Sequence, residues 1–129
     1  TLKVDQIQNT SDAHSSTPEQ IAQGRAKAWV ELEGTGSHSI IGSYNVSSVS
    51  NPSNGNYTVN FSTSFANTNY AAFATSGANV DTYDDGLDGI DNVALVCNKA
   101  VGNVRVGTGD LDNGDADDQD RVAVVIFAS

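Results

Sequence analysis

Eleven of the sixteen acidic residues fall in two short stretches, and clustered carboxylates are oxygen ligands that suit calcium. The first stretch holds Asp81, Asp84, Asp85, Asp88 and Asp91, and the second holds Asp110, Asp112, Asp115, Asp117, Asp118 and Asp120. Neither has EF-hand spacing, because Gly114 precedes Asp115 where the motif requires the reverse order, and no Glu follows at the twelfth position. The metal candidates are Asp84, Asp85, Asp88, Asp110, Asp112 and Asp115. Solvated acidic loops are the favoured interpretation over bound calcium.

Residue types that support nucleophilic catalysis are few and poorly spaced. His38 stands between Ser37 and Ser39 after a glycine, which is typical of a turn and not of a nucleophile elbow. His14 lies in a polar segment, so both histidines are expected to be ordinary surface residues. Cys97 has apolar neighbours and is expected to be a buried small hydrophobe, not a thiolate. A solvated aspartate cluster also lacks the apolar wall that raises the pKa of a glycosidase acid. The sequence therefore predicts no enzyme, no catalytic residue and no cofactor.

The composition favours one small β-rich domain. A chain of 129 residues is long enough for one core, and Asn, Ser, Thr and Gly dominate its polar part, which suits short strands and tight turns. The net charge of −10, with six basic residues, argues against nucleic acid and against an anionic membrane surface as partners. A single cysteine excludes an internal disulfide, and no apolar run reaches the length of a membrane span. The start at Thr1 is expected to reflect loss of an initiator Met from a complete small protein.

Residues 1–25 differ from the remainder and are expected to form an attachment or trimerisation segment. Alternating apolar residues predict a strand over residues 2–8, and a polar stretch without core-forming residues continues to residue 16. A short helix follows, with Thr17 as N-cap, Pro18 at the first helical position, Gln20 completing a capping box and Gly24 at the stop. So short a helix is unstable alone. The segment is therefore expected to dock on its own domain or on neighbouring subunits.

Residues 26–129 show the two-residue period of β-strands. Ala28, Val30 and Leu32 face one way, and Trp29 lies on the other side with charged neighbours. An apolar-rich run covers residues 37–50, and Asn54-Gly55 predicts a hairpin because both residues tolerate positive φ. Strands are predicted from residue 57 to 61, at 70–76, 92–99, 103–109 and 121–128. This spacing predicts an all-β fold, an antiparallel β-sandwich of jelly-roll-like form.

The last strand is apolar on both faces. Val122, Val124 and Ile126 lie on one face, and Ala123, Val125 and Phe127 on the other. An antiparallel sheet normally has one dry and one wet face. Two interpretations remain open: a long loop covers the outer face of a central strand, or a second subunit does.

One ordered set of short motifs runs along the chain. It includes Gln23-Gly24-Arg25-Ala26-Lys27-Ala28-Trp29-Val30, and its other parts are residues 2–11, 15–21, 34–36, 43–49, 55–61, 69–71 and 122–127. In this order the motifs resemble those of short virion proteins and fibre ends of marine tailed bacteriophages, while residues 77–120 depart from the pattern. The resemblance implies a homotrimeric β-rich fibre or fibre-tip subunit on the virion surface, with host-surface recognition as its usual role. It transfers no site residues.

The leading hypothesis is therefore a structural or adhesive appendage of a virion. Its expected partners are copies of itself, other virion proteins and a host receptor, with a glycan as one receptor class, and no nucleic acid or membrane insertion. The loops 77–91 and 107–120 are expected to face the receptor. A capsid decoration protein is the second hypothesis, and a calcium-dependent lectin-like module is the third.

Overall fold

A computed structural model describes residues 1, 3–8, 15–77, 92–110 and 114–129. An N-terminal segment, residues 1–25 and hereafter the arm, holds β1 (Ile7–Gln8), β2 (Ser15–Ser16) and α1 (Pro18–Gly24). The remaining strands are β3 (Ala28–Glu33), β4 (Ile40–Tyr44), β5 (Val46–Ser53), β6 (Asn56–Phe61), β7 (Ala71–Gly77), β8 (Asn92–Lys99), β9 (Asn103–Asp110) and β10 (Arg121–Phe127). The strand predicted at 92–99 is confirmed, and those at 70–76, 103–109 and 121–128 occur with ends shifted by one residue.

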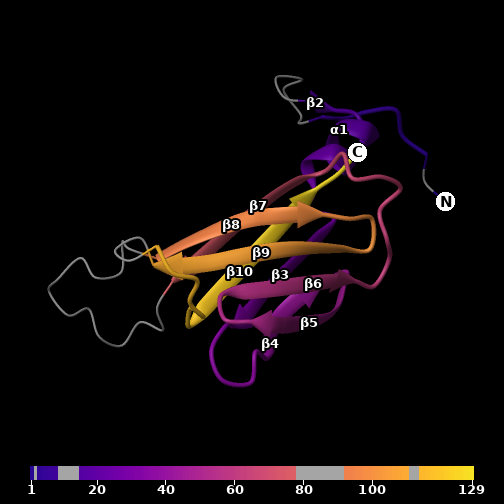
Figure 1. The fold of residues 1–129 in the computed structure, drawn as a ribbon. Coiled ribbons are helices and arrows are strands. Elements are labelled where there is room, and N and C mark those ends of the chain that lie inside the picture. Colours follow the sequence, from indigo (N-terminus) through magenta and orange to yellow (C-terminus); the bar gives the residue numbers. More distant parts are fainter. Residues whose placement is uncertain (2, 9–14, 78–91, 111–113) are drawn as a thin grey trace, which may run out of the picture.

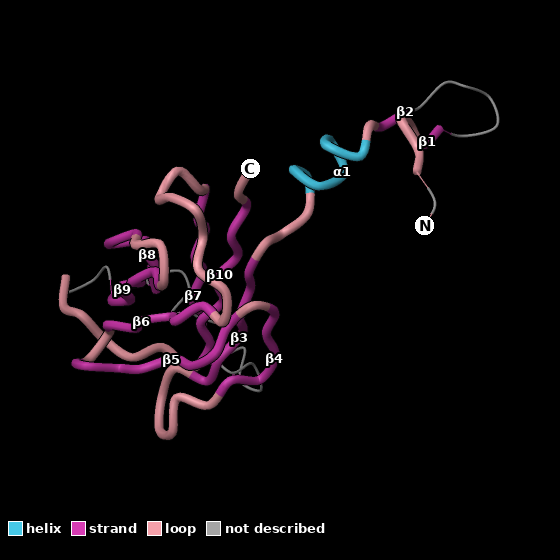
Figure 2. The backbone as a smooth tube through the Cα atoms, turned by 90° about the vertical axis from the view of Figure 1, so that its right-hand side faces the viewer, coloured by secondary structure: helices cyan, strands magenta, loops and turns pink. Residues whose placement is uncertain are grey.

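The eight longer strands form two four-stranded antiparallel sheets packed face to face (Figure 1). The first sheet has the order β4-β3-β10-β7, and the second has the order β5-β6-β9-β8. Figure 2 shows the two layers from the side, with the arm leaving from the side of the first sheet and extending away from the sandwich. The predicted all-β antiparallel sandwich is therefore confirmed.

The core lies between the sheets and follows from the two-residue period. In β3, Ala28, Val30 and Leu32 are buried, while Trp29, Glu31 and Glu33 are exposed, as the alternation predicts. β6 and β10 alternate in the same way. The core residues are Ala28, Val30, Leu32, Tyr57, Val59, Phe61, Tyr70, Val104, Val106, Val122, Val124 and Ile126. Because these side chains pack between the sheets, the alternate residues of β3, β6, β9 and β10 lie on the outer faces of the sandwich.

A corner at Asn45 divides the predicted run 37–50 between the two sheets. Asn45 has a φ of 54°, and its side chain donates to the carbonyls of Lys27 and Thr63 while accepting from the Thr63 N–H. β4 therefore ends one sheet and β5 begins the other. The hairpin predicted at Asn54-Gly55 is confirmed, but only Gly55 takes a positive φ, 64°.

Gly34 lies where the end of β3 meets the residues before β10. A Cβ at this position would clash with the Gln119 carbonyl and approach the Tyr57 hydroxyl to 2.9 Å. We expect Gly34→Ala to lower the free energy of unfolding by about 2–4 kcal/mol, because the neighbours are backbone and a buried ring that cannot both move. Urea denaturation measures this loss. Gly36→Ala has open space at its Cβ but a φ of 64°, so it is expected to cost only about 1 kcal/mol; equal losses would contradict the steric argument.

The arm differs from its prediction at the strand. The strand predicted over residues 2–8 is wrong for the described residues 3–6, and strand structure is limited to Ile7–Gln8, paired with Ser15–Ser16. In the described residues, the antiparallel ladder between β1 and β2 contains two residue pairs, Ile7 with Ser16 and Gln8 with Ser15. The helix is confirmed together with its capping box: Thr17 Oγ1 accepts from Gln20 N at 3.2 Å, and Gln20 Oε1 accepts from Thr17 N at 2.9 Å. No residue of α1 is buried.

The expected burial of Cys97 is wrong. Cys97 is exposed on the outer face of β8, and so is Leu95, 64% exposed. β8 is the edge strand of its sheet, and its register with β9 shifts between Val96 and Asn98. Ala94 and Val96 pack against the core instead. In the described part of the chain, no helix is long and apolar enough to span a membrane.

Candidate functional site

Asp118 is the centre of an extensive polar network. Its Oδ1 accepts from the Gly55 N–H at 2.6 Å and from Asn51 Nδ2 at 2.7 Å, and it lies 3.0 Å from the Tyr57 hydroxyl. That hydroxyl is also 2.8 Å from the Gly34 carbonyl oxygen. We call Asn51, Gly55, Tyr57 and Asp118 the Asp118 junction. It ties the β5–β6 hairpin to the loop before β10.

Two further contacts complete this connection. Asn54 donates to the Ala116 carbonyl at 2.9 Å and accepts from the Asp118 N–H at 3.2 Å. The buried Thr108 donates from Oγ1 to the Asp117 carbonyl at 2.6 Å. The junction has the features of a structural clamp, since its groups satisfy one another and face the protein interior.

The electrostatics of the junction favour an ionised Asp118. Burial raises the pKa of the Tyr57 hydroxyl, and the hydrogen bond to Asp118 and its negative charge add to this, giving about 12. Partial burial also raises the pKa of Asp118. The hydrogen bonds from Gly55, Asn51 and Tyr57, with the charge of His38, outweigh that effect and lower the pKa of Asp118 below 3.8.

This lowered pKa predicts an acid-sensitive clamp. A carboxyl whose pKa is lower in the folded state stabilises the fold above its unfolded value and loses that contribution as pH falls through the folded value. We expect the free energy of unfolding to drop as the pH is lowered from about 5 to below 3.8, the ordinary value for Asp118. Urea titrations over this range, with Asp118→Asn as comparison, measure the effect. Identical pH slopes for the two proteins would contradict it.

The predicted acidic candidates are only partly within the described residues. Asp84, Asp85, Asp88 and Asp112 lie outside them, as does the side chain of Asp110, while Asp115 is exposed. No group of metal-ligating side chains is assembled among the residues that the structure describes. The interpretation of the second stretch as a solvated loop needs correction at Asp118, which is half-buried and hydrogen-bonded. Sequence spacing could not separate it from its neighbours.

His38 is held by the turn. It has a φ of 52°, and its Nδ1 lies 2.7 Å from the Gly34 carbonyl oxygen, which only accepts, so Nδ1 carries the proton. Its ring meets Tyr57 edge-on, with centroids 6.0 Å apart. The expected surface position is thus only half correct, since the side chain is partly buried. His14 lies outside the described residues.

An apolar row crosses the outer face of the first sheet. The strand register places Tyr44 opposite Trp29, Trp29 opposite Val125, and Val125 opposite Phe73. Tyr44, Trp29 and Phe73 are 55%, 41% and 60% exposed. We call these four residues the aromatic row. No described segment of the chain covers this row. Val125 belongs to β10, the strand for which the sequence predicts apolar residues on both faces.

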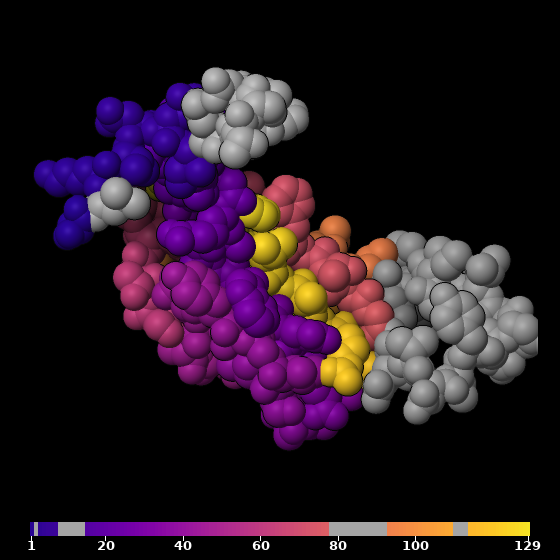
Figure 3. All heavy atoms as spheres, turned by 180° about the vertical axis from the view of Figure 1, so that it is seen from behind, coloured from indigo at the N-terminus to yellow at the C-terminus, as the bar shows by residue number. Residues whose placement is uncertain are grey.

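The surroundings of the aromatic row extend its apolar character. Phe127 packs edge-on against Phe73, with ring centroids 6.5 Å apart. A shallow depression of about 320 Å³ lies beside Trp29 and Phe73, and Ala123 forms part of its lining. Figure 3 shows this face, where β10 runs in yellow between β3 and β7. Farther along, Arg121 and Glu31 form an ion pair at 3.9 Å, and Lys27 lines a depression beside Tyr44.

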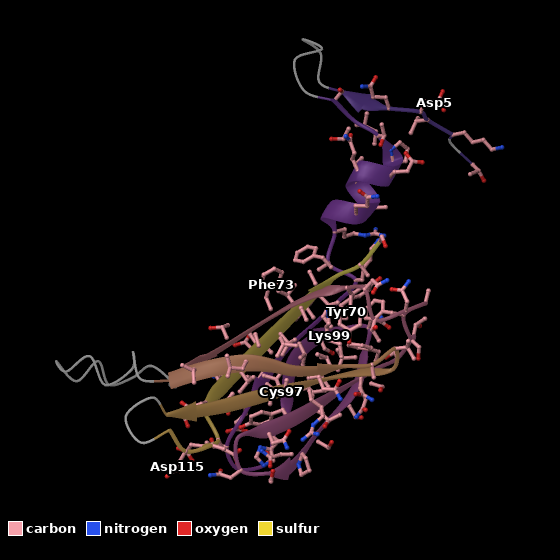
Figure 4. All side chains as sticks on the ribbon, turned by 45° about the horizontal axis from the view of Figure 1, so that its top comes forward. Asp5, Tyr70, Phe73, Cys97, Lys99 and Asp115 are labelled. Carbon is pink, nitrogen blue, oxygen red and sulfur yellow. The ribbon has the colours of Figure 1, made fainter. Side chains whose placement is uncertain are left out.

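The row and the exposed Asp115 lie at different ends of the domain. Trp29 follows the arm closely in sequence, and Figure 4 shows Phe73 toward the arm while Asp115 lies at the opposite end. The architecture is thus an acidic antiparallel β-sandwich with one exposed apolar face beside its N-terminal arm. Comparison of the chain with protein-family profiles, curated proteins and solved structures found no match in any of the three.

Proposed function

We propose that this chain is a structural or adhesive subunit of a tailed-phage virion appendage, a fibre or fibre-tip protein that works as a homotrimer. The observation that supports assembly is the exposed aromatic row, because large apolar side chains gathered on one face are typical of surfaces that bind a partner. The resemblance of most of residues 1–75, and of residues 122–127, to phage fibre ends supports the virion location.

The opposite sheet offers a useful contrast. Its outer face carries small polar residues such as Ser48, Ser50, Thr58 and Asn60, with Asn60 donating to Ser48 at 3.1 Å. This part of the face is well solvated and needs no cover, and Leu95 is exposed at the edge strand β8. The two outer faces of the sandwich therefore have different roles in the proposal: the first sheet binds neighbouring subunits and the second faces water.

The arm fits the same proposal as an attachment or trimerisation segment, because it extends away from the sandwich and its helix buries no residue (Figure 2). Recognition of a host-surface receptor, with a glycan as one class of ligand, is part of the proposal and rests on the resemblance. The jelly-roll-like topology stays a prediction.

Two measurements test the proposal. Sedimentation equilibrium of the full chain is expected to give three times the 13.4 kDa chain mass, and a single-copy species would overturn the assembly. Antibody labelling of whole virions is expected to mark a tail or fibre. Labelling spread over the capsid lattice would instead identify a decoration protein.

A further inference from the structure

The described part of the arm exposes large apolar side chains. Val4, Ile7 and Ile21 are 41%, 56% and 44% exposed. Ile21 belongs to a helix of seven residues, and a helix of that length is not stable in water without a packing surface. The arm therefore needs an apolar surface, and the aromatic row is one that the described residues leave uncovered.

The arm and the aromatic row lie on the same side of the molecule. The arm leaves the sandwich from the side of the first sheet, yet it extends outward and does not fold back over that sheet (Figures 2 and 3). Trp29 lies five residues beyond the end of α1. A neighbouring copy placed against the aromatic row is thus within reach of the arm.

The charge of the arm is compatible with its binding at the row. The arm has two basic and three acidic residues, so it carries about one of the ten net negative charges, and the sandwich carries the rest. A nearly neutral segment adds little charge repulsion when it binds. The acidic Asp115 end also points away from the row (Figure 4).

We propose that the aromatic row of each copy binds the arm of a neighbouring copy, with Ile7 and Ile21 against Trp29 and Phe73. The inference rests on the proposed function and names the contact through which the subunits assemble. Arm and row are different surfaces, so the contact is head-to-tail, and such contacts close into a ring when the rotation permits. Three copies joined in this way form the proposed trimer.

Cross-linking between two singly labelled full-length proteins tests the contact. Both carry Cys97→Ser, because Cys97 is exposed and would react. One adds Gln23→Cys on the exposed side of the arm, and the other adds Thr75→Cys beside Phe73. After mixing, subunit exchange and treatment with a short bis-maleimide, we expect a Gln23–Thr75 linked pair. A matched control replaces Thr75→Cys with Ser50→Cys, an exposed position on the other sheet, and is expected to give about tenfold less linked pair or lower.

Each alternative has its own result. Equal yields with Thr75→Cys and Ser50→Cys would overturn the inference, as would a dominant Thr75–Thr75 link, which indicates two rows face to face. A chain with both Gln23→Cys and Thr75→Cys that links within one copy, when the mixture gives no pair, would show that the arm folds onto its own row. A trimer without the Gln23–Thr75 link refutes this contact alone, whereas a single-copy full chain refutes the proposed function as well.

Discussion

A chain that carries Tyr44→Ser and Phe73→Ser is expected to lose assembly and sediment as a single copy. Aromatic anchors at the centre of an interface typically contribute about 2 kcal/mol or more each, which corresponds to about a 30-fold weaker dissociation constant per side chain. The two residues are 55% and 60% exposed, so the isolated domain loses little packing when they are shortened. Sedimentation velocity over a range of concentrations measures assembly, and thermal unfolding checks that the fold persists.

Leu95→Ser is the matched control for this experiment. Leu95 is 64% exposed, but it lies on the outer face of the other sheet, at its edge strand. Assembly is expected to be unchanged in this variant. If Leu95→Ser weakened assembly as strongly as the double change in the aromatic row, the proposal that the first sheet forms the subunit interface would be wrong.

Asp118→Ala is expected to lower the free energy of unfolding by about 2–3 kcal/mol, because three donors lose their common acceptor. Tyr57→Phe is expected to cost about 1–2 kcal/mol, since it removes one hydroxyl from a side chain that is otherwise retained in the core. The two groups contact each other, so the double variant is expected to lose less than the sum of the single losses. Urea denaturation of the unchanged protein, the two single variants and the double variant gives the double-mutant cycle that measures this coupling.

Asp117→Ala serves as the control because Asp117 is an exposed neighbour whose carboxylate accepts from Asn54 at 3.2 Å. An exposed interaction of this kind contributes little, and we expect a loss below about 1 kcal/mol. Losses of equal size for Asp117→Ala and Asp118→Ala would mean that negative charge in the loop, and not the junction geometry, stabilises the fold.

The clamp also bears on assembly. It holds the loop before β10 against the β5–β6 hairpin, and β10 contributes Val125 to the aromatic row. The Asp118 junction lies beside the start of β10, whereas Phe127 lies at the end of that strand. Loss of the junction is therefore expected to lower the free energy of unfolding of the domain before it changes the aromatic row. Assembly would then weaken only as far as the folded fraction falls.

The sequence by itself determined the local features of this protein. Alternation assigned Val30 to the core and Trp29 to the outside, and the capping box predicted the start of α1 at Pro18. Such signals depend on residues a few positions apart, so they can be recognised without knowledge of the fold. The predicted strand over residues 2–8 was wrong for residues 3–6, because alternation alone does not supply a ladder partner.

The tertiary structure alone decided which distant residues meet. Asp118 joins a hydrogen-bonded junction because Gly55 and Tyr57 arrive beside it from the hairpin. Cys97 is exposed because β8 became an edge strand with a register shift. The aromatic row exists because four strands from separate parts of the chain align in one register. Strand order and register minimise the free energy of the whole packed chain, and no local pattern encodes that choice.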